Sequence, residues 1–262
     1  MSARGVGLLG LSGLLLGVGG VAAGCSRTPA VRLEWTAMGT VAAVQARGPS
    51  AERHAPRLRD EARVVVSRLE ALLNAHDPRS ALSRLSALPD SEALARCPPA
   101  ASNCLAAAFR LKRESCGAFD PRHRGARTLD LGAIAKGLAL DEAGAAVKAP
   151  AADALLDLGG SLKVISGAWR VGIAGTDTVL VLTNGMACAT SSACYRGPHI
   201  RDGRTRLAVT NDVISVTVVH PTSAMLADGL STTLFVLGRD AGERFRAAHY
   251  PESSAYWVLK GE

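Results

Sequence analysis

One carboxylate and one hydroxyl lie four residues apart in the C-terminal part of the chain. They are Asp228 and Thr232, within the run HPTSAMLADGLSTTLFVLG from His220 to Gly238. Residues four apart share one face of a helix, and oxygen atoms are the ligands that Mg²⁺ prefers in proteins. The run therefore predicts an apolar helix that presents two oxygens to a hard cation. Asp228 alone could instead be a carboxylate stabilised by the dipole of its own helix.

A second polar segment is LDLGAIAKG, from Leu129 to Gly137. Lys136 lies near the start of a predicted helix, where an ammonium group and free backbone N–H groups could bind a pyrophosphate; a solvent-exposed lysine is the alternative. Asp130 could cap the same helix. The carbonyl of the small residue Ala133 could face the same ion as Asp228.

His199 is one of six histidines, and most histidines are surface or structural residues. An imidazole has an unperturbed pKa near 6.5, so it can accept a proton at neutral pH. In the block HIRDGRT, from His199 to Thr205, it is a candidate general base, whereas Asp202 and Thr205 have the residue types of a turn.

Five blocks together resemble the ApbE family of FAD:protein FMN transferases. They are AMGT (Ala37 to Thr40), LDLGAIAKG, LLDLGGSL (Leu155 to Leu162), HIRDGRT and the run from His220, in the family's order. The resemblance implies an α+β fold over residues 31–262, a single ApbE-like, T-fold-related domain of helices and mostly antiparallel strands, in one lobe or two. It also implies magnesium-dependent transfer of FMN from FAD to a Ser or Thr hydroxyl of an acceptor redox protein, with release of AMP.

The same resemblance assigns roles to individual residues. Magnesium would be held by the Ala133 carbonyl, Asp228 and Thr232, and His199 would assist removal of the acceptor's proton. Met38 would line the flavin pocket, although core packing is an equal alternative for it. The full set of positions that would bind FAD is Met38, Ala118, Phe119, Asp120, Asp130, Lys136 and Ile200.

One departure from the family pattern concerns the FAD site. Only Pro121 to Thr128 separate Asp120 from Leu129, where family members usually carry a much longer segment. One wall of the pocket is therefore expected to be short. Two other functions stay open for this reason: hydrolysis of FAD to FMN and AMP, and flavin binding without turnover.

Alternating and helical patterns predict the elements that position these residues. Val31 to Ala46 is expected to be a strand pair with AMGT at its turn. Helices are expected over Leu58–Leu73, Asn103–Ser115 and Ile134–Val147, with a short helical turn within Arg79–Leu88. Mostly sequential strands are expected over Ala154–Ile165, Trp169–Ile173, Thr178–Leu182, Met186–Thr190 and Ile214–Val219. This mixture is typical of an α+β domain.

The N-terminus predicts export. Residues 1–24 have a charged start, an apolar run and small residues before Cys25, which is typical of a lipoprotein signal peptide. Cys25 would be lipidated and begin a linker to residue 30, and the protein would be anchored on the periplasmic side of a bacterial membrane. An uncleaved membrane anchor is the alternative. Among the other cysteines, Cys97 with Cys104 and Cys188 with Cys194 are candidate disulfides.

Composition sets wider bounds. The chain has 262 residues, 48% of them hydrophobic, so it can bury a substantial core. Its formal net charge is +7, but the basic residues are scattered, and an exported protein rarely meets nucleic acid. Two groups, Arg53–Arg63 and Arg122–Arg127, are read as solvated surface, or as favouring anionic lipid or dinucleotide.

Overall fold

The strands of the domain form one large sheet and one small one. In this computed structural model, which describes residues 30–147, 152–193 and 199–261, the strands are β1 (Val31–Ala37), β2 (Thr40–Arg47), β3 (Asp153–Leu158), β4 (Ser161–Ser166), β5 (Trp169–Gly172), β6 (Val179–Leu182), β7 (Ala187–Ser192), β8 (Val213–His220) and β9 (Ser254–Leu259). The large sheet has the order β1-β2-β3-β4-β7-β8-β9, and every neighbouring pair in it is antiparallel. β5 and β6 form a separate two-stranded sheet.

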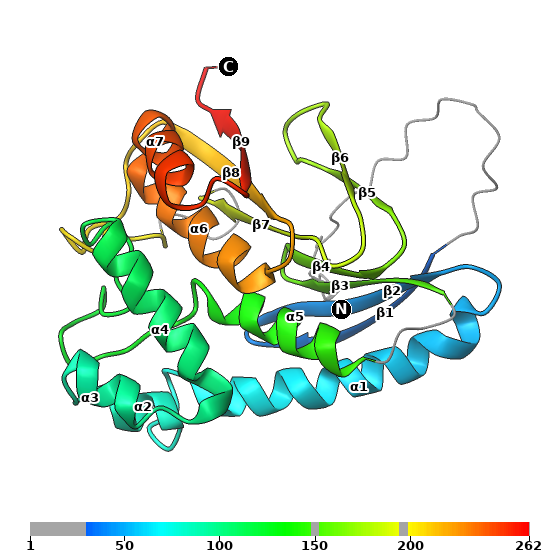
Figure 1. The fold of residues 1–262 in the computed structure, drawn as a ribbon, viewed down its shortest axis with the longest axis horizontal. Helices are drawn as coiled ribbons and strands as arrows, with labels where there is room; N and C mark the ends of the chain where they lie inside the picture. Colours follow the sequence, from blue (N-terminus) through cyan, green and yellow to red (C-terminus); the bar gives the residue numbers. More distant parts are fainter. Residues whose placement is uncertain (1–29, 148–151, 194–198, 262) are drawn as a thin grey trace, which may run out of the picture.

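Helices cover one face of the large sheet, and the β5–β6 hairpin covers part of the other (Figure 1). The helices are α1 (Ala51–Leu73), α2 (Ala81–Leu85), α3 (Asp90–Ala95), α4 (Pro99–Glu114), α5 (Ala135–Ala146), α6 (Ala224–Leu237) and α7 (Arg239–His249). The main apolar core lies between α1, α4, α5, α6 and the sheet. A smaller core lies under the hairpin, around Trp169, Leu180 and Leu182. The predicted α+β class is confirmed.

Two tight hairpins bring predicted motifs together. Met38 and Gly39 form the turn between β1 and β2, as expected for AMGT, and both have positive φ. The strand region expected over Ala154–Ile165 is the hairpin of β3 and β4, in which the glycine pair Gly159 and Gly160 ends the first strand and turns the chain with φ of 62° and 91°. A Cβ on Gly159 would lie 2.6 Å from the Thr40 hydroxyl oxygen. AMGT and the glycine pair of LLDLGGSL are therefore in contact.

The helices are longer or more numerous than their patterns indicate. α1 begins at Ala51 rather than Leu58, because its buried side chains continue through Ala51 and Ala55 past Pro56. Pro56 lies in the second turn of α1, where it removes one backbone hydrogen bond without ending the helix. α4 begins at Pro99 rather than Asn103, with proline in a position that favours helix starts. α3, α7 and β9 were not expected.

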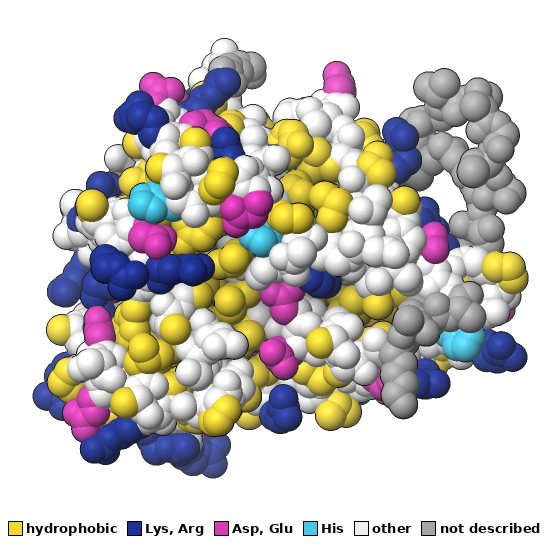
Figure 2. Space-filling view, in the orientation of Figure 1, with side chains coloured by type: hydrophobic (Ala, Val, Ile, Leu, Met, Phe, Trp, Pro, Cys, Tyr) yellow, Lys and Arg dark blue, Asp and Glu magenta, His cyan; other side chains and the backbone are white. Residues whose placement is uncertain are grey.

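The surface carries both signs of charge. Figure 2 shows Lys and Arg side chains along the left and lower edges of this face, over the region of α1 to α4, with Asp and Glu side chains among them. On α1, for example, Arg57 Nε lies 2.7 Å from Glu61 Oε1. This mixture is typical of a solvated surface. Within residues 30–147, 152–193 and 199–261, no helix combines the length and the apolar character that crossing a membrane requires.

Cys97, Cys104 and Cys116 are thiols. Cys97 precedes α4, whereas Cys104 lies buried in its second turn, and the candidate disulfide between them is not formed. Burial raises the pKa of the Cys104 thiol, which keeps it in its unreactive form. Residues 1–24, Cys25 and Cys194 lie outside the described residues, so the signal peptide, the lipidation and the pairing with Cys188 stay predictions.

Candidate functional site

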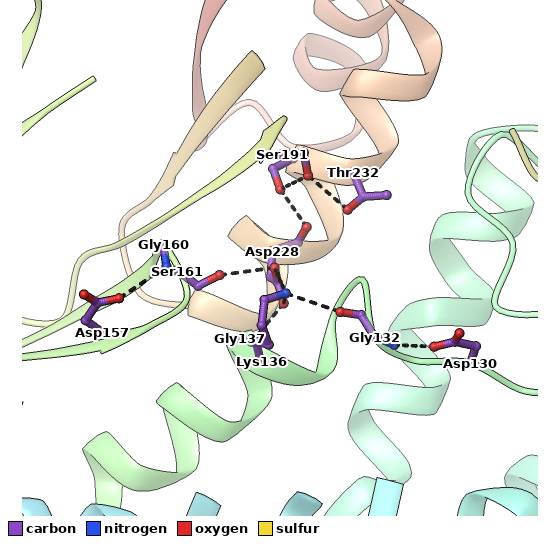
Figure 3. Close-up of polar contacts among 11 residues, drawn as sticks. Asp130, Gly132, Lys136, Gly137, Asp157, Gly160, Ser161, Ser191, Asp228 and Thr232 are labelled. Carbon is purple, nitrogen blue, oxygen red and sulfur yellow. Dashed lines mark hydrogen bonds and ion pairs between the residues drawn. The ribbon is translucent and has the colours of Figure 1, made fainter. Parts of the chain in front are cut away.

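Asp228 is the most buried acidic side chain of the predicted site. It is 4% exposed and lies in the second turn of α6. Its Oδ2 accepts a hydrogen bond from the Gly137 N–H (3.0 Å), and its Oδ1 accepts one from Ser161 Oγ (3.3 Å). These donors reach Asp228 from α5 and β4 (Figure 3). Because Gly137 lies in the first turn of α5, the helix dipole that stabilises this carboxylate is that of α5 rather than that of α6.

The ammonium group of Lys136 shows that this corner can hold a cation. Its Nζ lies 3.0 and 3.3 Å from the two Asp228 carboxylate oxygens and 3.3 Å from the Gly132 carbonyl oxygen. Its side chain is 23% exposed, so solvent can reach it. A carboxylate and a backbone carbonyl thus share one positive charge, and both are oxygen ligands of the kind that Mg²⁺ prefers. The donor set fits magnesium.

The other two predicted metal ligands lie on the same two helices or beside them. Thr232 follows Asp228 by one turn of α6, and its Oγ1 is 3.1 Å from Ser191 Oγ of β7. Ala133 is half-buried in the turn just before α5. Among the described residues, no cluster of three or more His, Cys, Asp and Glu side chains could bind a metal. A site here would depend on hydroxyl and carbonyl oxygens beside the one carboxylate.

Asp130 closes the turn that leads to Ala133. Its Oδ1 accepts a hydrogen bond from the Gly132 N–H (2.8 Å), and its Oδ2 lies 3.3 Å from Arg124 Nη1. It caps this turn rather than the helix, because the N-cap of α5 is Ile134. Its predicted contact with the flavin nucleotide is not tested by these contacts.

Met38 packs against the core, as one of its two expected roles requires. Its N–H donates to Glu70 Oε1 of α1 (2.7 Å), which fixes the left-handed backbone of this turn. Its side chain is only partly buried and packs against the main core. The side chain therefore contributes to packing, and its exposed part remains free to line a pocket.

The segment Ala118–Asp120 packs against the loop that begins at His199. Ala118 and Phe119 are buried, whereas Asp120 is partly exposed and lies 3.1 Å from Lys112 Nζ. The Gly203 N–H donates to the Ala118 carbonyl (3.0 Å). A Cβ on Gly203 would lie 2.4 Å from the Gly117 carbonyl oxygen, so this loop approaches the segment too closely for a larger residue.

His199 itself is exposed, and its neighbour Ile200 is buried. The rest of the loop is a closed turn, in which the Asp202 N–H donates to the Leu207 carbonyl (2.9 Å) and Asp202 Oδ2 lies 2.6 Å from Arg204 Nη2. The expected turn-stabilising role of Asp202 agrees with these contacts. The loop contacts the Ala118–Asp120 segment through Gly203, four residues after His199.

The short segment before Leu129 is organised by a buried arginine. Arg122 is 6% exposed, and its guanidinium donates to Asp90 Oδ1 (2.6 Å) and to the carbonyls of Ser86, Ala126 and Leu88 (2.7–2.8 Å). Three of these four acceptors lie 32 to 36 residues earlier in the chain, so Arg122 is a structural residue that ties this segment to the α2–α3 region. The sequence predicted that Arg122 belongs to a solvated basic group, and this prediction is wrong, because its side chain is buried.

His220 connects β8 to the start of α6. Its Nδ1 accepts hydrogen bonds from the N–H groups of Thr222 (3.2 Å) and Ser223 (3.0 Å), which only an unprotonated Nδ1 can do. Burial lowers the pKa of His220, partly offset by Glu252 at 3.3 Å.

We expect stability to fall as the pH drops below His220's ordinary pKa of 6.5. There the unfolded chain binds a proton that the folded chain does not, so unfolding becomes easier by at most about 1.4 kcal/mol per pH unit from this group. Chemical unfolding at about pH 7.5 and 5.5 measures the change. His220→Asn should show a smaller pH dependence, and an equal dependence in both proteins would contradict the assignment.

Three contributors to the site were not singled out from the sequence as interacting residues. Ser161 donates to Asp228, Ser191 bonds to Thr232, and Asp141 of α5 accepts from the first turn of α6. A serine or an aspartate in an element gives no signal of a long-range partner.

Comparisons with known proteins identify the family. A model of the ApbE family matches residues 122–257, just over half of the chain. A FAD:protein FMN transferase from Haemophilus influenzae is 33% identical over 133 residues, which cover 43% of this chain and 38% of that relative. The match thus spans well under half of that relative's length.

Solved structures share the fold. The flavin transferase ApbE from Vibrio cholerae has a TM-score of 0.72 at 21% identity, over 90% of this chain and 95% of that one. The flavinyl transferase ApbE from Pseudomonas stutzeri, in its apo form, has a TM-score of 0.71 at 22% identity, over 90% and 92%. Lys136, His199, Asp228 and the other predicted metal ligands all lie within the residues that the family model matches. With this match and this fold, the chain belongs to the ApbE family.

Proposed function

We propose that this chain transfers FMN from FAD to a Ser or Thr hydroxyl of an acceptor protein and releases AMP, with Mg²⁺ as its metal. The acceptor would be an exported or membrane redox protein, in line with the export and lipid anchoring that the N-terminal residues predict. Family membership and the name of the Haemophilus influenzae relative support the reaction.

The observation that carries the proposal is the cation held at Asp228. A buried carboxylate, a helix N-terminus and the Lys136 ammonium meet at one partly solvent-accessible corner. Such a corner can hold a metal that in turn binds phosphate oxygens. The residues that would hold Mg²⁺ are Asp228, Thr232 and the carbonyl of Ala133, and the ion would supply charge stabilisation at the phosphates when bound.

The protein's own groups have distinct roles in this reaction. His199 accepts the proton of the acceptor hydroxyl as that oxygen forms a bond to the phosphorus on the FMN side of FAD. The bond from this phosphorus to the oxygen that bridges the two phosphates breaks, and that oxygen leaves with AMP. Lys136 offsets negative charge on the phosphates. Asp130 stabilises the turn that carries Ala133 by accepting a hydrogen bond from the Gly132 N–H.

The direct test mixes the purified protein with FAD, Mg²⁺ and an acceptor protein of the kind that ApbE relatives modify. A mass gain of one FMN on the acceptor, with equal release of AMP, is the expected result. AMP release without an acceptor would instead indicate FAD hydrolysis. Intact FAD that stays bound would indicate a binding protein whose pocket is shortened at Pro121–Thr128.

We expect His199→Ala to lower the transfer rate by about 100-fold, because a positioned general base contributes about 10²–10⁴-fold. Initial rates of acceptor flavinylation at saturating FAD measure this. His249→Ala, at the exposed end of α7, is the matched control and should leave the rate unchanged. Equal rates in the His199 variant and the unmodified protein would remove His199 from the reaction.

A further inference from the structure

α5 and α6 each hold the first turn of the other with a carboxylate. Asp228 of α6 accepts from the Gly137 N–H in the first turn of α5 (3.0 Å). Asp141 of α5 accepts from the N–H groups of Ala224 (2.8 Å) and Met225 (3.0 Å) in the first turn of α6. Each carboxylate thus lies at the positive end of the partner helix's dipole.

The two carboxylates also have the same kinds of side-chain donor. Asp228 has a lysine, Lys136, and a serine, Ser161. Asp141 has Lys163 Nζ at 3.0 Å and Ser223 Oγ at 2.9 Å. One lysine, one serine and a helix N-terminus therefore surround each of them.

β4 contributes to both clusters. Ser161 and Lys163 are two residues apart on this strand, so their side chains project from the same face of the sheet. Ser161 faces Asp228, and Lys163 reaches both Asp141 and the Thr222 carbonyl (2.6 Å) just before α6. A displacement of α6 along β4 would therefore break both clusters together.

α5 and α6 are packed so closely that neither helix can shift along the other. At Gly137 an added Cβ would lie 2.2 Å from the Ala224 carbonyl oxygen and 2.5 Å from Met225 Cα. The backbones are in direct contact beside the residues that Asp141 binds. The position of the first turn of α6, and with it the direction of Asp228 one turn later, depends on this contact.

We propose that Asp141 is a positioning residue for the metal site: by holding the first turn of α6 against α5, it sets where Asp228 presents its carboxylate. This inference rests on the proposed metal site at Asp228. Asp141 contacts α6 and Lys163 and is not one of the proposed metal ligands. Its effect is transmitted by Ala224 and Met225, which lie four and three residues before Asp228 in the same helix.

The test is a Mn²⁺ titration of the purified protein, with free Mn²⁺ followed by electron paramagnetic resonance. We expect Asp141→Ala to raise the Mn²⁺ dissociation constant by about 10- to 100-fold, the usual effect of losing a residue that orients a metal ligand. Asp141→Asn, which keeps an acceptor oxygen, should recover part of the affinity. Asp177→Ala, in the exposed turn between β5 and β6, is the control and should bind as the unmodified protein does.

A second measurement needs no metal. Hydrogen exchange of the amides at the start of α6 should be faster in Asp141→Ala than in Asp177→Ala, since the amides of Ala224 and Met225 lose their acceptor. If Asp141→Ala does not fold, Asp141→Asn and Ser223→Ala provide the same comparison.

The outcomes separate this inference from the proposed function. If the unmodified protein binds no Mn²⁺, the metal site fails and the positioning role fails with it. If the unmodified protein binds Mn²⁺ and folded Asp141 variants bind it equally well, the positioning role alone is wrong. A purely structural Asp141 would lower the unfolding temperature and leave the Mn²⁺ affinity unchanged.

Discussion

Asp228→Asn is expected to reduce FMN transfer at least about 100-fold. Charge stabilisation by a bound metal is worth several kcal/mol at the transition state, and each 1.4 kcal/mol corresponds to about tenfold in rate. The replacement has nearly the same shape but no negative charge. The Gly137 N–H, Ser161 and Lys136 all donate to the Asp228 carboxylate. The NH₂ group of asparagine is itself a donor, so it would face one of these donors and lose that hydrogen bond.

Transfer assays at increasing Mg²⁺ concentration check this prediction. The transfer rate of the Asn variant should not recover at high Mg²⁺. The variant lacks the negative charge of Asp228, so the Lys136 ammonium would repel the metal without a carboxylate to offset it. Asp177→Asn, an isosteric change at an exposed turn, should behave as the unmodified protein. Full activity of the Asp228 variant at ordinary Mg²⁺ would rule out Asp228 as a metal ligand.

Gly137→Ala is expected to destabilise the protein by about 3 kcal/mol, the upper part of the usual range for an overpacked contact. Helix propensity alone predicts the opposite sign, because alanine favours a helix interior over glycine by about 1 kcal/mol. The steric term is larger here, since the new methyl group would meet the backbone of α6 at 2.2–2.5 Å. Neither helix backbone can yield as a flexible side chain would.

Chemical unfolding of Gly137→Ala beside Gly172→Ala separates these effects. Gly172 lies in β5, and an added Cβ there meets nothing within 4 Å, so its replacement should be close to neutral. Because the new methyl group would push α6, and with it Asp228, away from the Gly137 N–H, the Ala variant should lose Mn²⁺ affinity as well as stability. Unchanged stability would mean that α5 and α6 can separate without loss of packing.

The sequence predicts most of the elements that carry apolar periodicity. α5, α6, β8 and the β1–β2 pair agree with their expected positions within a few residues, because their buried side chains recur at regular spacing. The missed α7 and β9 lie after the last recognised motif. The division of Ala154–Ile165 into β3 and β4 follows from Gly159 and Gly160, a glycine pair of the kind that ends a strand.

The site is predictable only in part, for a different reason. Asp228, Thr232 and Lys136 can be found because motifs contain them, but their partners Ser161 and Asp141 are ordinary residues brought near by the sheet order. The role of Arg122 was also hidden. A basic residue in a basic loop has the pattern of a solvated side chain, and only the carbonyls of Ser86, Leu88 and Ala126 show that it is buried.

The centre of the sheet has a consequence for folding. The pairing of β4 with β7 joins the N-terminal half of the sheet to the C-terminal half, and its register contains only two residue pairs. The N-terminal half supplies Ala133, Lys136 and Ser161. The C-terminal half supplies Asp228 and Thr232. Neither half can assemble the site alone, so an intermediate with one half ordered would have no ligand affinity. Ligands that bind only the complete site stabilise this junction by mass action. Substrate and metal would then stabilise those chains that have finished folding.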